Sequence, residues 1–266
     1  MHGPGQAFPG FLLSGTGFMD IYSPLFGELL APKYLTWLLQ GFGVTLMLSA
    51  LTCLVATGLG FVLCLGRIAR SRLIVWPVQS YLSVFRNTPL LVQLFFWYFG
   101  ATVLLPEGLR DWLNTPHSLD LMLFGLRWPA FEYIAGFIGL TLYTSAFIAE
   151  EFRAGVRGVS AGQVEAASAL GMNRWQVWRH IVMPQAVRIA LPPLLGQYMN
   201  AIKNSSMTMA IGLAELSYAS RQVETETFKT FQAFGIATLL YIGIIVIIEL
   251  FGHRFQARQL ALRPGR

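Results

Sequence analysis

Two basic residues stand inside long apolar stretches, where a charge is costly. Arg86 interrupts the uncharged run 73–106, and Lys203 interrupts the uncharged run 189–214. An intramembrane charge costs at least about 2.5–3.5 kcal/mol on insertion scales, so it usually faces a bundle interior or an aqueous cavity. The apolar stretches contain no acidic residue within these limits. Two cations without an anion therefore favour an anionic ligand.

Small polar residues follow each cation, and Pro89 should break the helix after the first group. Broken helices with polar backbone at mid-depth form ligand sites in membrane transport proteins. Two alternatives stay open: Arg86 as a structural or gating residue, and Lys203 reaching the interface or pairing with an acid of a neighbouring subunit. The candidate ligand-pathway residues are Arg86, Asn87, Thr88, Lys203, Asn204, Ser205 and Ser206.

A different pattern lies in the polar segment 150–188, where two short helices should meet at a glycine. Ser160 with Gln163 three residues later fits a capping box, so the first helix should begin at about Ala161. Its middle is rich in helix-forming residues. Gly171 is suited to the position just past a helix end, where the backbone turns left-handed.

Asn173 should cap the second helix, with Gln176 at its third position, and Pro184 should end it. An apolar stripe of this helix should consist of Trp175, Trp178 and Ile181. The expected product is a compact, bent helical pair. It fits either an amphipathic element at the membrane surface or a docking element for a partner's groove.

The amino-acid composition indicates which class of protein holds these residues in place. The 266 residues are 55% hydrophobic and only 12% charged, whereas soluble domains carry about 25% charged residues. This excludes a soluble single-core enzyme and a disordered chain. The net charge of +6 suits a membrane surface better than nucleic acid.

The charges divide the chain into apolar segments of spanning length, about 20 residues each. We expect an all-α membrane protein with five transmembrane helices and a single transmembrane domain over 34–266. Pro192 and Pro193 should distort the start of the fourth helix. The expected spans are 34–66, 73–106, 133–149, 189–214 and 230–248.

Basic residues set the orientation. With the C-terminus inside, the inner segments 67–72, 150–188 and 249–266 hold twelve Lys and Arg, and the outer segments 1–33, 107–132 and 215–229 hold five. The positive-inside rule therefore places the N-terminus outside and the 150–188 loop in the cytoplasm. Residues 1–33 should form an outer lead-in segment, and 107–132 an outer loop with turn chemistry.

The loop resembles the EAA signature of ABC importer permeases, with Met183 in place of a leucine as the only departure. Glu165-Ala166-Ala167 is followed after three residues by Gly171, and after nine more by Ile181-Val182-Met183-Pro184. The segments 85–93, 142–155 and 203–206 resemble the polar-amino-acid branch of this family. The runs 203–213 and 95–99 resemble its glutamate/aspartate permeases most.

The resemblance implies a permease subunit in a bacterial inner membrane that alternates between outward and inward access. Its loop would dock into a cytoplasmic ABC ATPase dimer, which binds ATP and Mg. The other implied partners are a second permease subunit, paralogous or identical, and a periplasmic amino acid binding protein. The residues carried over to the ATPase-coupling loop are Glu165, Ala166, Ala167, Gly171, Ile181 and Pro184.

The alternative is a stand-alone, ion-coupled secondary amino acid transporter. That class typically shows inverted repeats and intramembrane acids, and neither pattern is visible in the sequence. The chain also lacks the G-x-x-x-x-G-K-[ST] phosphate loop, so ATP hydrolysis should belong to a partner. The four histidines fall in separate segments, so neither a catalytic constellation nor a metal site is expected.

Overall fold

The computed structural model describes residues 30–115, 118–121, 124–127 and 131–261, which form a helical bundle with one short hairpin. The elements in chain order are α2 (Pro32–Arg67), α3 (Arg72–Asn87), α4 (Leu90–Phe95), the π-helix η1 (Phe96–Gly100), α5 (Ala101–Leu104), α6 (Glu107–Asn114), β1 (Ser118–Leu121), β2 (Phe124–Arg127), α7 (Phe131–Arg157), α8 (Ala161–Ala169), α9 (Arg174–Val177), the π-helix η2 (Trp178–Val182), α10 (Met183–Ser205), the 3₁₀-helix η3 (Ser206–Ile211), α11 (Leu216–Thr227) and α12 (Thr230–Ala261).

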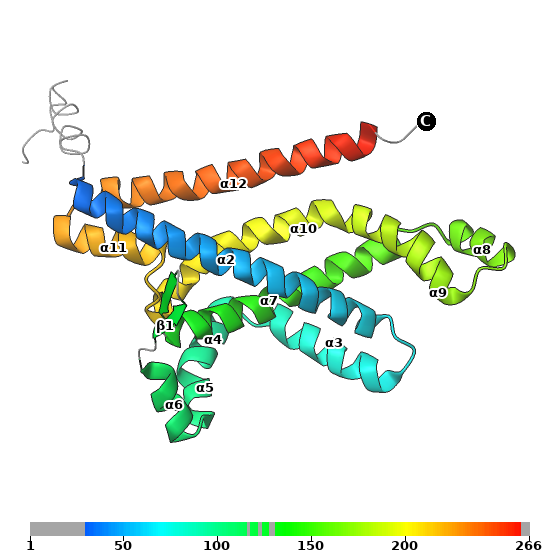
Figure 1. Ribbon diagram of the computed structural model, residues 1–266, viewed down its shortest axis with the longest axis horizontal. Helices are drawn as coiled ribbons and strands as arrows, with labels where there is room; N and C mark the ends of the chain where they lie inside the picture. The colour runs from blue at the N-terminus through cyan, green and yellow to red at the C-terminus, as the bar shows by residue number, and fades with distance from the viewer. Residues whose placement is uncertain (1–29, 116–117, 122–123, 128–130, 262–266) are drawn as a thin grey trace, which may run out of the picture.

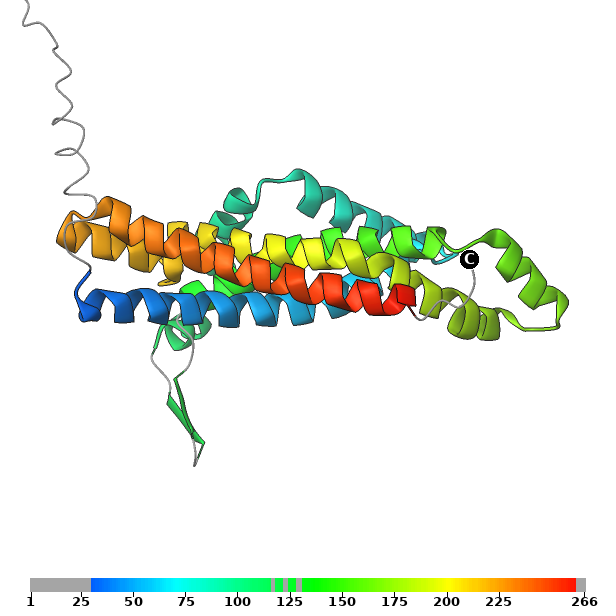
Figure 2. The ribbon, with the colours of Figure 1, turned by 90° about the horizontal axis from the view of Figure 1, so that it is seen from above.

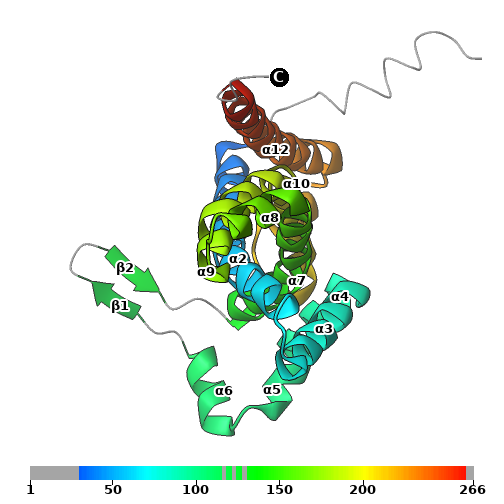
Figure 3. The ribbon, with the colours of Figure 1, turned by 90° about the vertical axis from the view of Figure 1, so that its right-hand side faces the viewer.

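The centre of the bundle consists of α2, α7 and α10, which pack against one another along their lengths (Figures 1 and 3). Small residues allow α2 to approach α7 closely: a Cβ on Gly60 would lie 2.6 Å from a side-chain atom of Ile148. The most apolar stretch of α7 is 50% buried, whereas that of α12 is 6% buried. In a membrane, α12 therefore offers nearly all of this stretch to lipid or to another subunit, whereas α7 buries half of its own against neighbouring helices.

Three helices are long and apolar enough to cross a membrane, and they coincide with the first, third and fifth expected spans: Pro32–Arg67, Phe131–Arg157 and Thr230–Arg254. The second expected span is divided by a break at Thr88 and Pro89. The fourth consists of α10 followed by η3. Pro192 and Pro193 lie inside α10 without ending it. Helical structure dominates all five segments, while the number of spans stays a prediction.

Among the described residues, the fold is all-helical apart from the expected outer loop 107–132, which contains regular secondary structure. It contains the helix α6 and an antiparallel hairpin in which Leu119 pairs with Leu126 and Leu121 pairs with Phe124. The sequence alternates apolar with other residues over these two stretches, which is the period of a strand. The hairpin projects away from the helices (Figures 2 and 3).

The connections gather at the two ends of the bundle. The α2–α3 connection, α8 with α9, and the C-terminal part of α12 lie toward one end, on the right of Figure 1. The start of α2, together with α11 and α6, lies toward the other. Segments expected on the same side of a membrane therefore share an end. The expected outer lead-in segment 1–33 lies outside the described residues as far as position 29.

Candidate functional site

The polar segment after α7 folds into a compact bent unit that projects beyond the bundle (Figures 1 and 2). We call α8, α9 and η2 with their connections, residues 161–182, the α8–α9 unit. The bend is at Gly171, whose φ is +81°. The N–H of Met172 donates to the carbonyl of Ala167 at 3.2 Å, and that of Gly171 to Ser168 at 3.0 Å. These two bonds form a Schellman motif, so the expected glycine bend is confirmed.

The cap of the first helix differs from the prediction. Ser160 stands at the N-cap position, but its side chain makes no capping hydrogen bond. Gln163 does not bond back to Ser160, because its amide oxygen accepts a hydrogen bond from Gln185 on α10 instead. A tertiary contact has therefore replaced the expected local one.

The second helix has the predicted cap and a different end. The N–H of Gln176 donates to Asn173 Oδ1 at 3.0 Å, and the N–H of Asn173 donates to Gln176 Oε1 at 2.8 Å, which completes a capping box. Pro184 does not end the helix, because α9, η2 and α10 follow one another without a break. Pro184 lies in the first turn of α10. The wider π-helical turn before it separates the proline ring from the preceding carbonyl groups, with which it would collide in a regular α-helix.

A small hydrophobic core holds the α8–α9 unit together. Ala167, Val177 and Val182 are its buried members, and Trp178 and Ile181 pack against them. The expected stripe is wrong for Trp175, whose surface is 65% exposed. Leu170 beside the bend is 84% exposed. The unit is therefore internally packed and presents two large apolar side chains outward.

The structure divides the coupling-loop candidates between the core and the surface of this unit. Ala167 is buried, Ile181 is half-buried, and Glu165, Ala166 and Pro184 are exposed. A Cβ on Gly171 would contact nothing within 4 Å, so the glycine is needed for its backbone conformation. The exposed members, with Leu170 and Trp175, form a surface on which another protein could dock.

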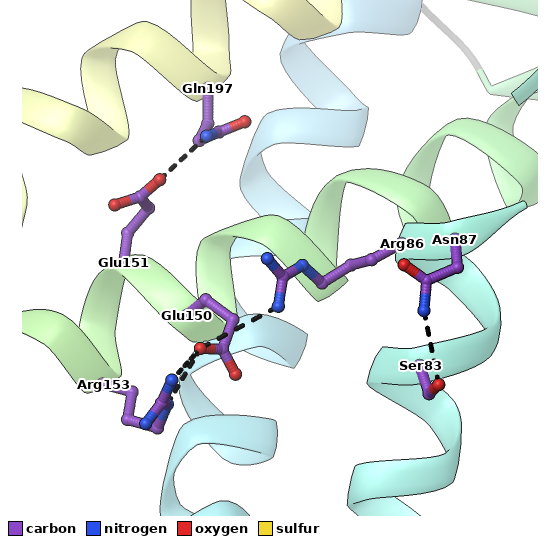
Figure 4. A network of polar contacts seen from close by, with 7 residues as sticks. All are labelled: Ser83, Arg86, Asn87, Glu150, Glu151, Arg153 and Gln197. Atoms are coloured by element: carbon purple, nitrogen blue, oxygen red, sulfur yellow. Dashed lines mark hydrogen bonds and ion pairs between the residues drawn. The ribbon is translucent and has the colours of Figure 1, made fainter. Parts of the chain in front are cut away.

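The first cation of the apolar stretches is paired. Arg86 lies in the last turn of α3, and its Nη1 is 3.9 Å from Oε2 of Glu150 on α7 (Figure 4). Arg153 also donates to Glu150, with Nε at 2.9 Å. The side chain of Glu150 is 18% exposed and that of Arg86 41%. One carboxylate thus serves two guanidinium groups, which leaves the cluster with a net positive charge.

A second polar contact joins the central helices close to the first. The amide of Gln197 on α10 donates to Glu151 Oε1 on α7 at 2.9 Å (Figure 4). Glu150 and Glu151 lie one and two residues beyond the expected limit of the third span, on the same helix α7, so acids do lie beside the cation Arg86 and the amide of Gln197. The expected span ended at 149 because the first charge was taken as its limit.

The break after Arg86 is stabilised by a side chain that sequence reasoning gave no role. Thr88 Oγ1 donates to the carbonyl of Val84 at 2.7 Å, and Asn87 Nδ2 is 3.4 Å from Ser83 Oγ. Gln93, which is buried on α4, donates from Nε2 to the carbonyls of Phe85 and Thr88, both at 3.0 Å. Gln93 therefore supplies partners for carbonyls that Pro89 leaves without a helical donor. The position of Gln93, four residues after Pro89, was the sequence feature that could have indicated this role.

The second polar group is less open than expected. The hydroxyls of Ser205 and Ser206 donate to the carbonyls of Ile202 and Lys203, each at 2.7 Å. Ser205 is fully buried, and Asn204 is half-buried. Lys203 is exposed, whereas Arg86 lies beside the carboxylate of Glu150. The two cations therefore differ in their surroundings.

Sequence reasoning also missed a buried carboxylate. Glu215 is 0% exposed and caps α11 by accepting from the N–H groups of Ser217 and Tyr218. Tyr241 of α12 donates to Glu215 at 2.8 Å, and Thr45 of α2 lies 3.4 Å away. Glu215 thus ties α11 to two spanning helices. In the sequence, the only local feature that could have indicated this role is a carboxylate residue, Glu215, directly before the start of a helix.

The chain is similar to proteins of known families. The model of the family "Binding-protein-dependent transport system inner membrane component" matches residues 56–260. The probable glutamine ABC transporter permease protein GlnM of Bacillus subtilis is 34% identical over 80% of this chain and 88% of that protein. The glutamate/aspartate import permease protein GltJ of Escherichia coli is 30% identical over 82% of this chain and 85% of that protein. A crystal structure of an amino acid ABC transporter with histidines has a TM-score of 0.71 at 29% identity, over 85% of this chain and 95% of that one.

Proposed function

Because the chain belongs to the family of binding-protein-dependent transport system inner membrane components, we propose that it imports glutamate and aspartate into the cytoplasm. It is a transmembrane permease subunit of an amino acid ABC importer, as its relatives indicate. The proposed mechanism is alternating access, driven by a separate ATPase. The proposed setting is a bacterial inner membrane with the α8–α9 unit on the cytoplasmic side.

The observation that carries this proposal is the form of the α8–α9 unit. It projects beyond the bundle, has its own core, and exposes Glu165 and Ala166 beside the glycine bend. A rigid knob of this kind fits a groove in another protein better than it fits a lipid surface, because Glu165 and the polar turn at Asn173 lie beside Leu170 and Trp175. We assign this groove to the ATPase.

The proposed substrate rests on one relative and on the cation Lys203. GltJ is a glutamate/aspartate permease, whereas GlnM is described for glutamine and the similar solved structure holds histidine. Relatives with different substrates share this fold, so the fold alone cannot select one. Lys203 supports an anionic substrate because it is exposed on α10 close to the start of η3. Arg86 supports it less, since Glu150 already lies beside its guanidinium group.

The first experiment tests the docking surface. The chain is purified from its native membrane in mild detergent, and co-purifying proteins are identified for wild type, Glu165→Lys and Glu249→Lys. Glu249 is also exposed, but it lies on α12 beside His253, so its reversal is a matched control. We expect an ATPase with wild type and Glu249→Lys and not with Glu165→Lys. Equal recovery of the ATPase with both variants contradicts the assigned groove.

The second experiment tests the substrate. The complex is reconstituted with its binding protein, and ATPase stimulation is measured with glutamate, aspartate, glutamine, arginine and histidine. We expect stimulation by the two acidic amino acids, reduced in Lys203→Ala and retained in Lys203→Arg. Stimulation by glutamine alone contradicts the glutamate/aspartate assignment. Uptake that continues without the ATPase supports the stand-alone transporter instead.

A further inference from the structure

Residues of α2 and α11 line a polar trough. The start of α2, together with α11, lies at the end of the bundle opposite the α8–α9 unit (Figure 1). The trough consists of two hollows of about 330 and 340 Å³ that share Trp37 and Gln222. Arg221 and Glu226 line the first hollow, and Gln40 lines the second. Pockets of about 300–1,000 Å³ are typical of small-molecule sites. We call this continuous hollow the α2–α11 trough.

Residues of opposite charge, Arg221 and Glu226, line the same hollow as the aromatic ring of Trp37. Arg221 is exposed, and its guanidinium group makes no hydrogen bond or ion pair within the part of the chain that the structure describes. Glu226 pairs with Lys33 at 3.7 Å, with side chains that are 47% and 62% exposed, and it accepts a hydrogen bond from the hydroxyl of Tyr34 at 3.4 Å. The ammonium group of Lys33 lies 4.7 Å from the ring centroid of Trp37. An exposed pair of this kind contributes little, about 0–1 kcal/mol, so a ligand can replace it.

The fold explains why these polar groups face a hollow. Leu216, Ala219 and Val223 form the buried face of α11 and pack in one cluster with residues of α2 and α12. The opposite face of α11 therefore carries Arg221 and Gln222 outward. Exposed amides on a spanning helix are unfavourable against lipid tails.

Gln40 is such an exposed amide, since it lies within the apolar spanning helix α2. The trough must accordingly face water or another protein. A merely solvated face would not need to collect both charges and two amides around one ring.

We propose that the α2–α11 trough is an entry site for a zwitterionic α-amino acid. Arg221 binds its carboxylate, for which the planar guanidinium fork is suited. Glu226 and the face of Trp37 bind its ammonium group, as carboxylates and aromatic rings do. The amides of Gln40 and Gln222 contact the side chain of the ligand. The proposal rests on the amino acid transport function and adds a binding site within this subunit.

The test measures access to the trough and its occupation. Gln222→Cys is prepared in the complete transporter in nanodiscs and treated with a charged, membrane-impermeant thiol reagent. The wild-type chain provides the background, because its thiols Cys53 and Cys64 are half-buried and buried. Gln40→Cys is the second variant, should the first fold poorly. Phe228→Cys, on a residue that is 86% exposed just past α11, is the matched position outside the trough.

We expect free L-glutamate to slow the labelling of Gln222→Cys in a saturable way. At ten times the dissociation constant, mass action leaves about one site in eleven free, so labelling should slow by about tenfold. Phe228→Cys should show no protection. Adding Arg221→Gln should abolish the protection, measured against the ligand-free labelling rate of the same double variant.

Two results overturn the proposal. Labelling that glutamate and glutamine both leave unchanged shows that the trough binds no amino acid. Labelling that occurs in the isolated chain but not in the complex shows that a partner subunit covers it. ATPase stimulation by the amino-acid-loaded binding protein, measured on the same preparations, separates the two failures. Intact stimulation without protection refutes the trough alone, and absent stimulation by every amino acid refutes the transport function.

Discussion

The conformation of Gly171 leads to a quantitative prediction for the α8–α9 unit. Its φ of +81° lies in the left-handed region, and a Cβ there would meet nothing within 4 Å. Gly171→Ala therefore adds no collision, only the cost of a left-handed L-residue, about 1–2 kcal/mol. Such a cost lowers the equilibrium ratio between the hydrogen-bonded bend and the opened bend by about 5–30-fold.

Hydrogen exchange at the bend measures this ratio. The N–H groups of Gly171 and Met172 are held by the Schellman bonds, so their exchange reports opening of the bend. We expect Gly171→Ala to speed exchange in peptides covering 168–176 by about 5–30-fold and to reduce recovery of the ATPase. Gly171→Asn should have a smaller effect, because asparagine enters the left-handed region more readily.

Gly162→Ala is the matched control within the same helix. Gly162 lies inside α8, and a Cβ on it would find only Ser160 Oγ, at 3.8 Å. Gly162 is the second residue of α8, where glycine costs less than it does in mid-helix, about 0.5–1 kcal/mol, so this change should leave exchange unchanged or slow it slightly. If Gly171→Ala exchanges as slowly as wild type, the left-handed residue does not determine the bend, and the reasoning is refuted.

Three further substitutions test the polar contacts and the π-helical turn. Glu150→Gln should lower the melting temperature in detergent more than Arg86→Gln, because it leaves two guanidinium groups together without a carboxylate; the opposite order contradicts the pairing. Gln93→Leu should cost about 1–3 kcal/mol by leaving two buried carbonyls without a donor, whereas Val92→Leu on the exposed face should change the melting temperature little. Pro184→Ala should slow hydrogen exchange across η2, since the new N–H allows a regular helical turn; unchanged exchange there would show that the proline does not cause the π-helix.

Features set by neighbouring residues could be predicted from the sequence. The bend at Gly171 and the capping box of Asn173 with Gln176 depend on groups within five residues of each other, and both form as expected. The apolar periods that indicated the long helices are likewise local. The resemblance at positions 165–184 added the family, which the comparison over residues 56–260 supports.

Features set by distant residues could not be predicted. The pair between Arg86 and Glu150 joins residues 64 positions apart on different helices. The amide of Gln163 bonds to Gln185 on α10 rather than to the nearby cap. Helix α7 continues beyond the expected span limit at 149 to Arg157, and the two acids just past that limit contact Arg86 of α3 and Gln197 of α10. In each case, a partner from another helix decided the outcome.

The α8–α9 unit is connected differently to α7 and to α10. This difference determines which of the two helices a displacement of the unit reaches directly. On the side of α7, the helix ends at Arg157, and non-helical residues lead to α8. On the other side, α9, η2 and α10 form one unbroken helical run. A displacement of α9 is therefore transmitted directly to α10, and it reaches α7 through the packing of α10 against α7. Gln197 of α10 also donates a hydrogen bond to Glu151 of α7, so relative motion of the two helices requires this contact to break or to move with them.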